Sequence, residues 1–395
     1  MAVRQYILLN FLHGNSPYLR TTELAIAVND ELAKLGKPRM GIVVPLVYGD
    51  SQEKIMRENF ATHIARYPDE LLFEETLGGK LYPIFYDGKT TYEDSLKFFL
   101  ANQRTIERDI QNYIEGGLTV RTVAGVELHI AKKDIAMEIS RCPQVHYGLS
   151  RSYFTGFDYI SEVLARALED KNLGFNKNLL TDSIPLYEEL ERKQTLHFIA
   201  EPSIFSYLGN RPRKYPTEIF TPPNTNQLKW LADASDVGDL KKGIYVTITG
   251  VPGLTRLYTE ALDLGLTIYT HRPELIAGSI KAPPSVLVSD QVLLHFARSG
   301  WGSVWLSQLT KTPFVAKPYT PQDDLEIYFN NICLERLGLA KVYRGENLKE
   351  LLDYGVEFKD NVMLLMNRLM EKYGRVGGVE YIAFKITKDY LKLTG

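Results

Sequence analysis

The sequence has few residues suited to disulfides or metal sites, and it has no strong charge of either sign. Its 395 residues include two cysteines, Cys142 and Cys333, which lie far apart and outside any metal-ligand spacing. This argues against a disulfide scaffold and a cysteine-based zinc site, and it is typical of a reducing compartment. Histidines and carboxylates are not grouped at ligand spacing either, so no metal site is predicted. The net charge of −2 provides no long-range field for nucleic acid, and we expect no nucleic-acid partner.

Long apolar runs are also missing. The N-terminal run from Tyr6 to Leu12 is too short for the hydrophobic region of a signal peptide. Nothing in the chain approaches the roughly 20 apolar residues that a membrane-spanning helix needs. We therefore expect a cytoplasmic protein. Peripheral contact with a membrane surface stays open, because a short surface patch would leave no clear trace in the sequence.

The composition is that of an ordinary globular protein, with 45% hydrophobic and 24% charged residues. The chain is longer than a single hydrophobic core usually supports, so two domains are expected. The stretch from Gly209 to Asn226 holds four of the nineteen prolines and little apolar periodicity, and it is predicted to be the linker. We predict an N-terminal domain over residues 1–215 and a C-terminal domain over residues 216–380.

Both halves alternate short apolar runs with amphipathic segments, which predicts α/β domains with mostly parallel sheets. In the first half, a helix is expected over about residues 22–35 with Thr21 as its N-cap, between the strands Tyr6–Leu12 and Met40–Val47. A long helix over residues 91–113 begins with a capping box. Strands are expected in the second half at residues 243–249, 266–270, 292–297 and 314–317. The fold class is therefore α/β, with two Rossmann-like domains facing each other across a cleft.

One loop in the second half has the features of a phosphate site. A buried strand ends near Ala297, a turn with Gly300 and Gly302 follows, and a helix is expected to begin near Ser303. Free N–H groups and partial positive charge at a helix N-terminus favour a phosphate, and glycine allows the backbone to approach it closely. Arg298 adds a cation. An ordinary turn in which Ser303 only caps its own helix remains the alternative. A second glycine loop, Gly250–Gly253, follows the first strand of the same half.

Residues 285–331 resemble the donor-binding signature of nucleotide-sugar glycosyltransferases of GT-B architecture, the UDP-glycosyltransferase-like superfamily. Those enzymes have His-x-Gly-Trp-x-Ser at the start of a helix, then Gly-x-Pro and a strand, then an Asp-Gln pair before another helix. This sequence has SGWGS at 299–303, TPFV at 312–315 and QDD at 322–324. The resemblance implies that the C-terminal domain binds a nucleotide-diphosphate sugar of the UDP, GDP or dTDP type. It also implies that a terminal helix, residues 381–395, packs back on the N-terminal domain.

The resemblance assigns roles to individual residues. It places Arg298 and Ser303 at the diphosphate, and the Asp323–Asp324 pair at the hydroxyls of the donated sugar. The ribose-binding Glu of the family is replaced by Leu306, which leaves the donor nucleotide open. His13 stands near the position of the family's general base, and an imidazole suits removal of a hydroxyl proton. The expected donor-binding residues are Gly250, Gly253, Arg298, Ser299, Gly300, Gly302, Ser303, Gln322, Asp323 and Asp324. The expected acceptor-binding residues are Gly14, Asn15, Tyr147 and Tyr153.

The resulting expectation is an enzyme, a glycosyltransferase that moves a sugar to an acceptor hydroxyl without a metal or other cofactor. Inversion at the anomeric carbon is favoured, because no Glu-x7-Glu pattern lies near residue 320. The acceptor is a small molecule, a glycan or a lipid. An epimerase or phosphorylase of the same architecture, or a relative that binds a nucleotide sugar without turnover, remains an alternative, since fold alone does not decide the reaction.

Overall fold

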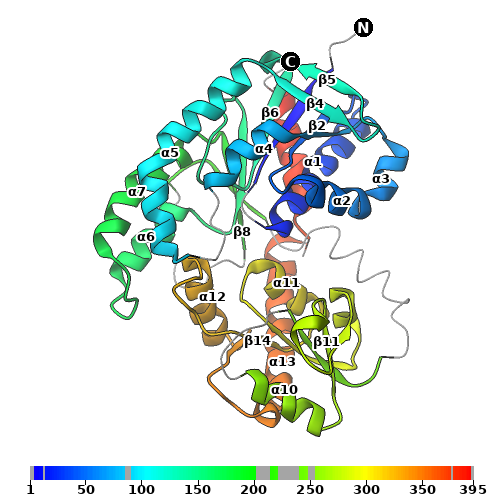
Figure 1. Ribbon diagram of the computed structural model, residues 1–395, viewed down its shortest axis with the longest axis vertical. Helices are drawn as coiled ribbons and strands as arrows, with labels where there is room; N and C mark the ends of the chain where they lie inside the picture. The colour runs from blue at the N-terminus through cyan, green and yellow to red at the C-terminus, as the bar shows by residue number, and fades with distance from the viewer. Residues whose placement is uncertain are drawn as a thin grey trace. The chain divides into compact units, whose positions relative to one another are not determined.

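The computed structural model describes residues 4–11, 14–84, 90–201, 214–220, 240–247, 254–374 and 377–392, without the side chains of Asn15, Ser16 and Phe220. The chain divides into two compact units. Among the described residues, the first unit contains 4–201, 214–220 and 379–392, and the second contains most of 240–378. Each unit is a mostly or wholly parallel sheet with helices packed on it (Figure 1).

The first unit is built on a sheet that has nine strands within the described residues, in the order β5-β4-β3-β2-β1-β6-β7-β8-β9. The pairs are parallel except β3 with β4 and β4 with β5. The strands are β1 (Tyr6–Asn10), β2 (Gly41–Pro45), β3 (Leu71–Glu74), β4 (Leu118–Thr122), β5 (Glu127–Ile130), β6 (Ile135–Ser140), β7 (Ser152–Gly156), β8 (Leu196–Ala200) and β9 (Thr217–Phe220).

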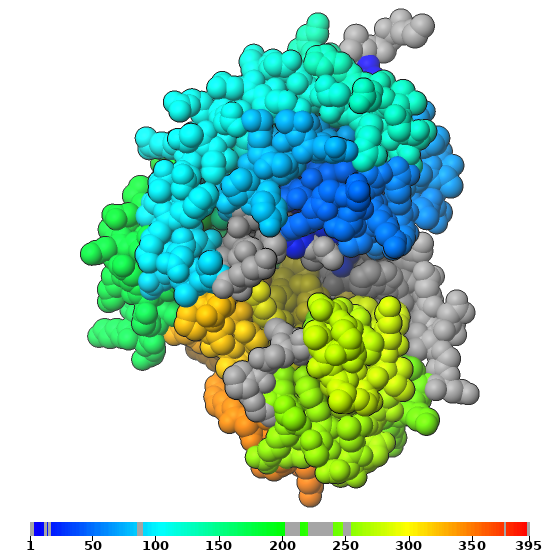
Figure 2. All heavy atoms as spheres, viewed as in Figure 1, coloured from blue at the N-terminus to red at the C-terminus, as the bar shows by residue number. Residues whose placement is uncertain are grey.

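Helices cover this sheet, so its central strands β1, β2 and β6 are buried along almost their whole length and are mostly apolar. They are α1 (Asn15–Lys34), α2 (Gly49–Asn59), α3 (Ala61–Arg66), α4 (Glu75–Leu81), α5 (Tyr92–Glu115), α6 (Ile160–Glu169), α7 (Lys177–Arg192) and α14 (Val379–Lys392). On the face shown in Figure 2, much of the surface of this unit comes from the blue to cyan segments, which include α2 to α5. The predicted capping box of α5 is confirmed, because the Thr91 hydroxyl accepts a hydrogen bond from the Asp94 N–H at 3.2 Å.

Helix α1 begins earlier than predicted. Its first residue is Asn15, and Thr21, which was expected to be the N-cap, lies inside the helix. The Thr21 hydroxyl donates to the carbonyl of Pro17 at 2.7 Å, one helical turn back. Pro17 is tolerated because it lies in the first turn, where its missing N–H would have no helical partner. The proline therefore marks the start of this helix and not a loop.

The second unit has a six-stranded sheet, within the residues described, in the order β12-β11-β10-β13-β14-β15, and every pair is parallel. The strands are β10 (Gly243–Val246), β11 (Thr267–Thr270), β12 (Ile280–Lys281), β13 (Val292–Ala297), β14 (Phe314–Ala316) and β15 (Lys341–Val342). The helices are α10 (Leu254–Asp263), α11 (Trp301–Thr310), α12 (Leu325–Arg336) and α13 (Leu348–Tyr373).

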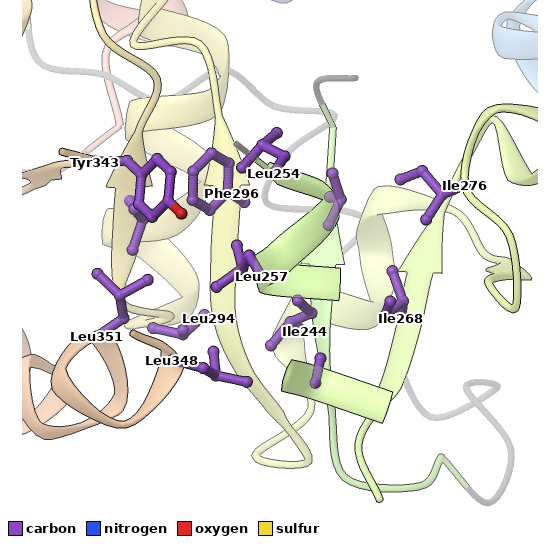
Figure 3. Packing of buried hydrophobic residues seen from close by; sticks show 13 residues of the cluster. Ile244, Leu254, Leu257, Ile268, Ile276, Leu294, Phe296, Tyr343, Leu348 and Leu351 are labelled. Atoms are coloured by element: carbon purple, nitrogen blue, oxygen red, sulfur yellow. The ribbon is translucent and has the colours of Figure 1, made fainter. Parts of the chain in front are cut away.

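One hydrophobic core of this unit lies between the sheet and the pair α10 and α13 (Figure 3). Ile244 and Phe296 from the sheet meet Leu257 of α10 and Leu351 of α13, and all four are buried. A second buried cluster on Tyr245 and Tyr269 includes Leu306 of α11. Because both faces of the sheet are covered, its strands carry apolar residues in sequence and not in alternation.

The end of the first unit differs from the prediction. Residues 209–226 were predicted to be the linker, yet β9 lies within them and pairs in parallel with β8 as the edge strand of the first sheet. The first unit thus extends to Phe220, and residues 216–220 do not belong to the C-terminal unit as predicted. Helix α14 is part of this unit and packs against α1. The Tyr153 hydroxyl donates to Asp389 of α14 at 2.7 Å.

Among the described residues, no helix is both long enough and apolar enough to cross a membrane.

Candidate functional site

The turn after β13 lies at the carboxyl end of the second sheet, next to the loop after β14. Because β13 and β14 are parallel neighbours, their following loops emerge at the same edge. The first loop contains Arg298 and Gly300 and leads into α11, whose N-cap is Gly300. The second loop contains Lys317 and Asp323 and leads into α12. The helix of the first loop therefore begins at Trp301, two residues before the predicted start at Ser303.

Arg298 is ion-paired to both residues of the predicted acidic pair. Its Nε lies 2.9 Å from Asp323 Oδ1, and its Nη2 lies 3.3 Å from Asp324 Oδ2. The Arg298 side chain is 36% exposed, so part of the guanidinium remains accessible. The structure thus brings together the residues that the sequence assigned to the diphosphate and to the sugar.

Asp323 and Asp324 also hold the local backbone. Asp323 is buried, pairs with Lys317 Nζ at 2.8 Å and accepts hydrogen bonds from Thr320. Asp324 is the N-cap of α12 and accepts from the Ile327 N–H at 3.2 Å. Of the two carboxylates, Asp324 is the more exposed, so it is the better candidate for a ligand contact.

Ser299 does not fit the predicted donor contact. Its side chain is fully buried, and its hydroxyl lies 2.7 Å from Asn331 Oδ1. The neighbouring Asn330 amide donates to the Ser299 carbonyl at 2.6 Å. These two asparagines of α12 fix the shape of the turn, a role that the sequence analysis missed because their partners lie about thirty positions earlier.

A third carboxylate, which the sequence analysis also missed, occupies the N-terminus of α11. Glu326 Oε1 accepts from the Trp301 N–H at 3.3 Å and from the Asn330 amide at 3.3 Å. A carboxylate at this position is stabilised by the same N–H groups and helix dipole that would favour a phosphate. The two neighbouring loops and the start of α12 therefore carry two cations, Arg298 and Lys317, and three carboxylates, Asp323, Asp324 and Glu326.

The remaining residues predicted to bind the donor differ from one another in how exposed they are. Gly302 and Ser303 form the first turn of α11 and are partly exposed, and a Cβ added at Gly300 would meet no atom within 4 Å. Gln322 is exposed in the loop before α12. Leu306, which replaces the family's ribose-binding Glu, is buried in the core. The predicted residues Gly250 and Gly253 lie outside the described residues.

A buried histidine of β13 connects α11 to the residue that follows β10. His295 Nδ1 lies 2.6 Å from the Ser307 hydroxyl, and its Nε2 lies 2.7 Å from the Thr247 hydroxyl. Burial lowers the pKa of His295 to about 3, so the ring is neutral at physiological pH. This chain of contacts holds α11 in place behind the turn.

In the first unit, the predicted base His13 and two of the predicted acceptor residues, Gly14 and Asn15, follow β1 in the sequence. His13 lies outside the described residues. Gly14 has φ of +102°, which other residues adopt only with strain, and its N–H donates to the Tyr48 hydroxyl at 2.7 Å. Asn15 is the first residue of α1. Tyr48 is therefore a further side chain at this position that sequence reasoning did not find.

The two tyrosines predicted to bind an acceptor are core residues. Tyr147 and Tyr153 are both fully buried, and their hydroxyls donate to the carbonyl of Leu9 and to Asp389. Neither ring offers surface to a ligand, so the prediction is wrong for both side chains in this structure. The aromatic-rich segment around them supplies core packing instead, because large apolar rings bury well.

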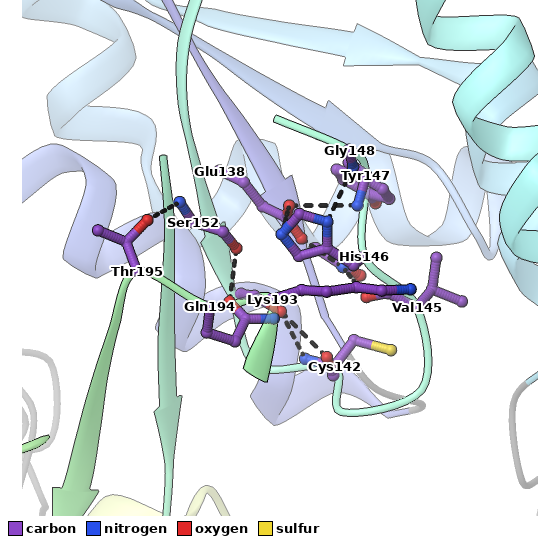
Figure 4. A network of polar contacts seen from close by, with 12 residues as sticks. Glu138, Cys142, Val145, His146, Tyr147, Gly148, Ser152, Lys193, Gln194 and Thr195 are labelled. Carbon is purple, nitrogen blue, oxygen red and sulfur yellow. Dashed lines mark hydrogen bonds and ion pairs between the residues drawn. The ribbon is translucent and has the colours of Figure 1, made fainter. Parts of the chain in front are cut away.

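A buried polar network lies at the carboxyl ends of β1 and β6 (Figure 4). Glu138 is fully buried and accepts from the Asn10 amide at 2.7 Å and from the Tyr147 N–H at 3.3 Å. His146 Nε2 lies 3.9 Å from the same carboxylate, and its Nδ1 accepts from the Gly148 N–H. Burial raises the pKa of Glu138, and the nearby His146 opposes this. The network orders the loop that follows β6.

The chain was compared with known proteins. Neither a protein-family model nor a curated protein sequence matches it. Solved structures do match over 98% of the chain. They include a UDP-glucosyltransferase from Polygonum tinctorium (12% identity, TM-score 0.58, 99% of that chain covered) and UGT89C1 from Arabidopsis thaliana in complex with UDP (11%, 0.60, 100%). UGT71G1 from Medicago truncatula in complex with UDP-glucose also matches (12%, 0.56, 98%).

The chain has the GT-B fold of the UDP-glycosyltransferases. The predicted fold class, α/β with two Rossmann-like domains, is confirmed by these matches and by the two parallel sheets. At 11–12% identity the likeness is one of fold, and the side chains of the site must be judged from this chain. Within the part of the chain that the structure describes, no group of three or more His, Cys, Asp or Glu is placed to hold a metal ion.

Proposed function

We propose that the protein is a glycosyltransferase that moves a sugar from a nucleotide-diphosphate sugar to an acceptor hydroxyl. The observation that supports this best is the turn from Arg298 to Ser303, where a partly exposed guanidinium and a helix N-terminus meet at the carboxyl edge of a GT-B sheet. A diphosphate is the ligand that such a turn favours. UDP-sugars are the first donors to test, because the similar structures were solved with UDP and UDP-glucose, and GDP- and dTDP-sugars follow.

The proposed reaction is a displacement at the anomeric carbon. The acceptor oxygen forms the new bond, and the bond from the anomeric carbon to the phosphate oxygen breaks with its electron pair left on the diphosphate. Arg298 and the N-terminus of α11 stabilise that charge without a metal. His13 is proposed, on the sequence pattern alone, as the base that takes the acceptor proton, and inversion follows from a single displacement. The acceptor is proposed to be a small molecule, a glycan or a lipid.

A second candidate is a relative that binds a nucleotide sugar without turnover. The observation in its favour is the set of carboxylates at the turn, since Asp323 and Asp324 pair with Arg298 and Glu326 occupies the N-terminus of α11. A diphosphate must compete with these groups, which lowers its affinity. The two candidates share the binding step and differ in the transfer step.

The test is a screen of UDP-, GDP- and dTDP-sugars for donor hydrolysis and transfer, with and without EDTA. We expect turnover with at least one donor, unchanged by EDTA. Arg298→Ala should weaken donor binding, whereas Arg256→Ala, which removes an exposed arginine of α10, should not. His13→Ala should lower the rate by roughly a hundredfold to ten-thousandfold and spare binding.

The possible outcomes separate the two candidates. Binding of UDP without any turnover would favour the second candidate. Absence of nucleotide binding would reject both. Turnover that EDTA abolishes would reject the metal-free mechanism.

A further inference from the structure

A cavity of about 480 Å³ lies in the second unit at the amino ends of β13 and β14. Its walls come from the segment before β13, from the end of α11 with the following Thr312 and Pro313, and from the middle of α13. Arg298 and Gly300 follow the carboxyl end of β13, so the cavity lies at the opposite edge of the sheet from the candidate donor site. The volume lies within the range of roughly 300–1,000 Å³ that is usual for small-molecule sites.

The walls of this cavity are mainly apolar. Val292, Pro313, Leu352 and Val356 line it, and Val356 is 72% exposed. Gly355 of α13 also lines it, and a Cβ built there would lie 3.1 Å from Pro313 Cγ. The lack of a side chain at Gly355 therefore leaves room beside Pro313.

Two lysines stand beside these apolar walls. Lys311 and Lys359 both line the cavity and are exposed, and neither forms an ion pair with any residue that the structure describes. Asp290 is the carboxylate among the lining residues, and it accepts a hydrogen bond from the Gln291 side chain. The cavity thus combines an apolar body with an excess of positive charge.

Lys311 holds its position in an unfavourable backbone conformation. It has φ of 55°, and it is the one non-glycine residue with positive φ among those described. It ends α11 in a Schellman motif, in which the Thr312 N–H donates to the Ser307 carbonyl at 3.0 Å. Glycine is the residue usually found at this position, because a Cβ is strained there. Lys311 therefore stands at a helix end where glycine would be less strained.

We propose that this cavity binds a small organic anion, a molecule with one carboxylate and an apolar body. The apolar body lies against Val292, Pro313, Leu352 and Val356, and the carboxylate meets Lys311 and Lys359. A carboxylate complements the charge of these two lysines, which lack other ion-pair partners in the described chain. This site is separate from the proposed glycosyl transfer, and neither proposal depends on the other.

The test is calorimetric titration of the full chain with octanoate, with n-octylammonium and acetate as matched probes. We expect octanoate to bind with a Kd on the order of 1 mM, a value reasonable for a ligand of this size. Octylammonium carries the same apolar body with the opposite charge, and acetate carries the charge without the body. Neither should bind measurably over the same concentration range.

Variants then test the residues. Lys311→Gly and Lys359→Gln should each weaken octanoate binding about three- to tenfold, and Asp290→Asn should strengthen it about twofold. Lys349→Gln, an exposed lysine of α13 that does not line the cavity, is the control and should change nothing. Lys311→Gly should also raise the melting temperature, so its loss of binding cannot be ascribed to unfolding.

Three results would overturn the proposal. The first is no octanoate binding at 10 mM, roughly tenfold above the expected Kd. The second is equal binding of octanoate and octylammonium. The third is an unchanged affinity in both lysine variants.

Discussion

Replacing Glu326 by Gln tests whether the N-terminus of α11 is the phosphate site. In the structure, Glu326 Oε1 accepts from the Trp301 N–H at 3.3 Å and from the Asn330 amide at 3.3 Å. A diphosphate bound at this helix N-terminus would lie close to the carboxylate. Gln keeps the size of the side chain and an oxygen acceptor but removes the charge. Nucleotide binding and folding stability should therefore change in opposite directions.

The magnitude follows from the geometry. Two like charges about 5 Å apart repel by roughly 1 kcal/mol at an effective dielectric constant of about 40–80. Removing this repulsion should strengthen UDP binding about fivefold. The same carboxylate stabilises the free protein through the helix dipole, and its loss should lower the free energy of unfolding by about 0.3–1 kcal/mol.

The assay is calorimetric titration with UDP, together with urea denaturation of the ligand-free protein, at low ionic strength. Glu350→Gln is a matched control, because Glu350 lies in the first turn of another helix, α13, whose N-cap is Asn347. The control should lose a similar amount of stability and show unchanged UDP affinity. Added salt should reduce the difference between wild type and Glu326→Gln.

Weaker UDP binding in Glu326→Gln would refute the reasoning, because it would mean that the carboxylate contacts the ligand directly. An unchanged affinity with a normal loss of stability would move the phosphate away from this helix N-terminus. Strengthened binding in the Glu350→Gln control would show that net charge, and not the position of Glu326, sets the affinity.

Four further predictions follow from individual contacts. Arg298→Ala should weaken UDP binding about ten- to a hundredfold in a titration, because a charge-assisted contact contributes roughly 1.5–3 kcal/mol. The same change should lower the free energy of unfolding by about 1–2 kcal/mol, since Asp323 and Asp324 lose their cation. Burial lowers the pKa of His295 to about 3, whereas a histidine in the unfolded chain has a pKa of about 6.5. The neutral ring therefore stabilises the fold fully above about pH 6.5, and this stability is lost toward pH 3 by at most about 1.4 kcal/mol per pH unit. In urea denaturation between these pH values, the free energy of unfolding of His295→Gln should depend less steeply on pH. Tyr153→Phe removes the hydrogen bond to Asp389 of α14 and should lower the free energy of unfolding by about 1–2 kcal/mol, and an unchanged urea midpoint would contradict this. Lys311→Gly should raise the free energy of unfolding by about 1 kcal/mol in the same assay, because glycine relieves the left-handed conformation.

Much of the architecture could be predicted from the sequence, because its signals are local. Strand β13 coincides with the predicted segment, and the capping box of α5 is in place, since apolar runs and caps act within a few residues. The turn at Arg298–Ser303 was recognised for the same reason. The misplaced start of α1 also has a local cause, because the predicted helix began after Thr21 and left out Pro17, which belongs to the first turn.

Only the tertiary structure decided what these residues touch. The partners of the turn after β13 come from α12, which follows the neighbouring parallel strand, so Glu326 and Asn331 have no spacing that links them to the turn. The burial of Tyr147 and Tyr153 depends on strands and a terminal helix that lie far away in the chain. Strand β9 likewise forms because β8 offers it a sheet edge. Periodicity records which side of an element is apolar, whereas pairing and burial are set by the elements that pack against it, and a single sequence contains no local trace of those.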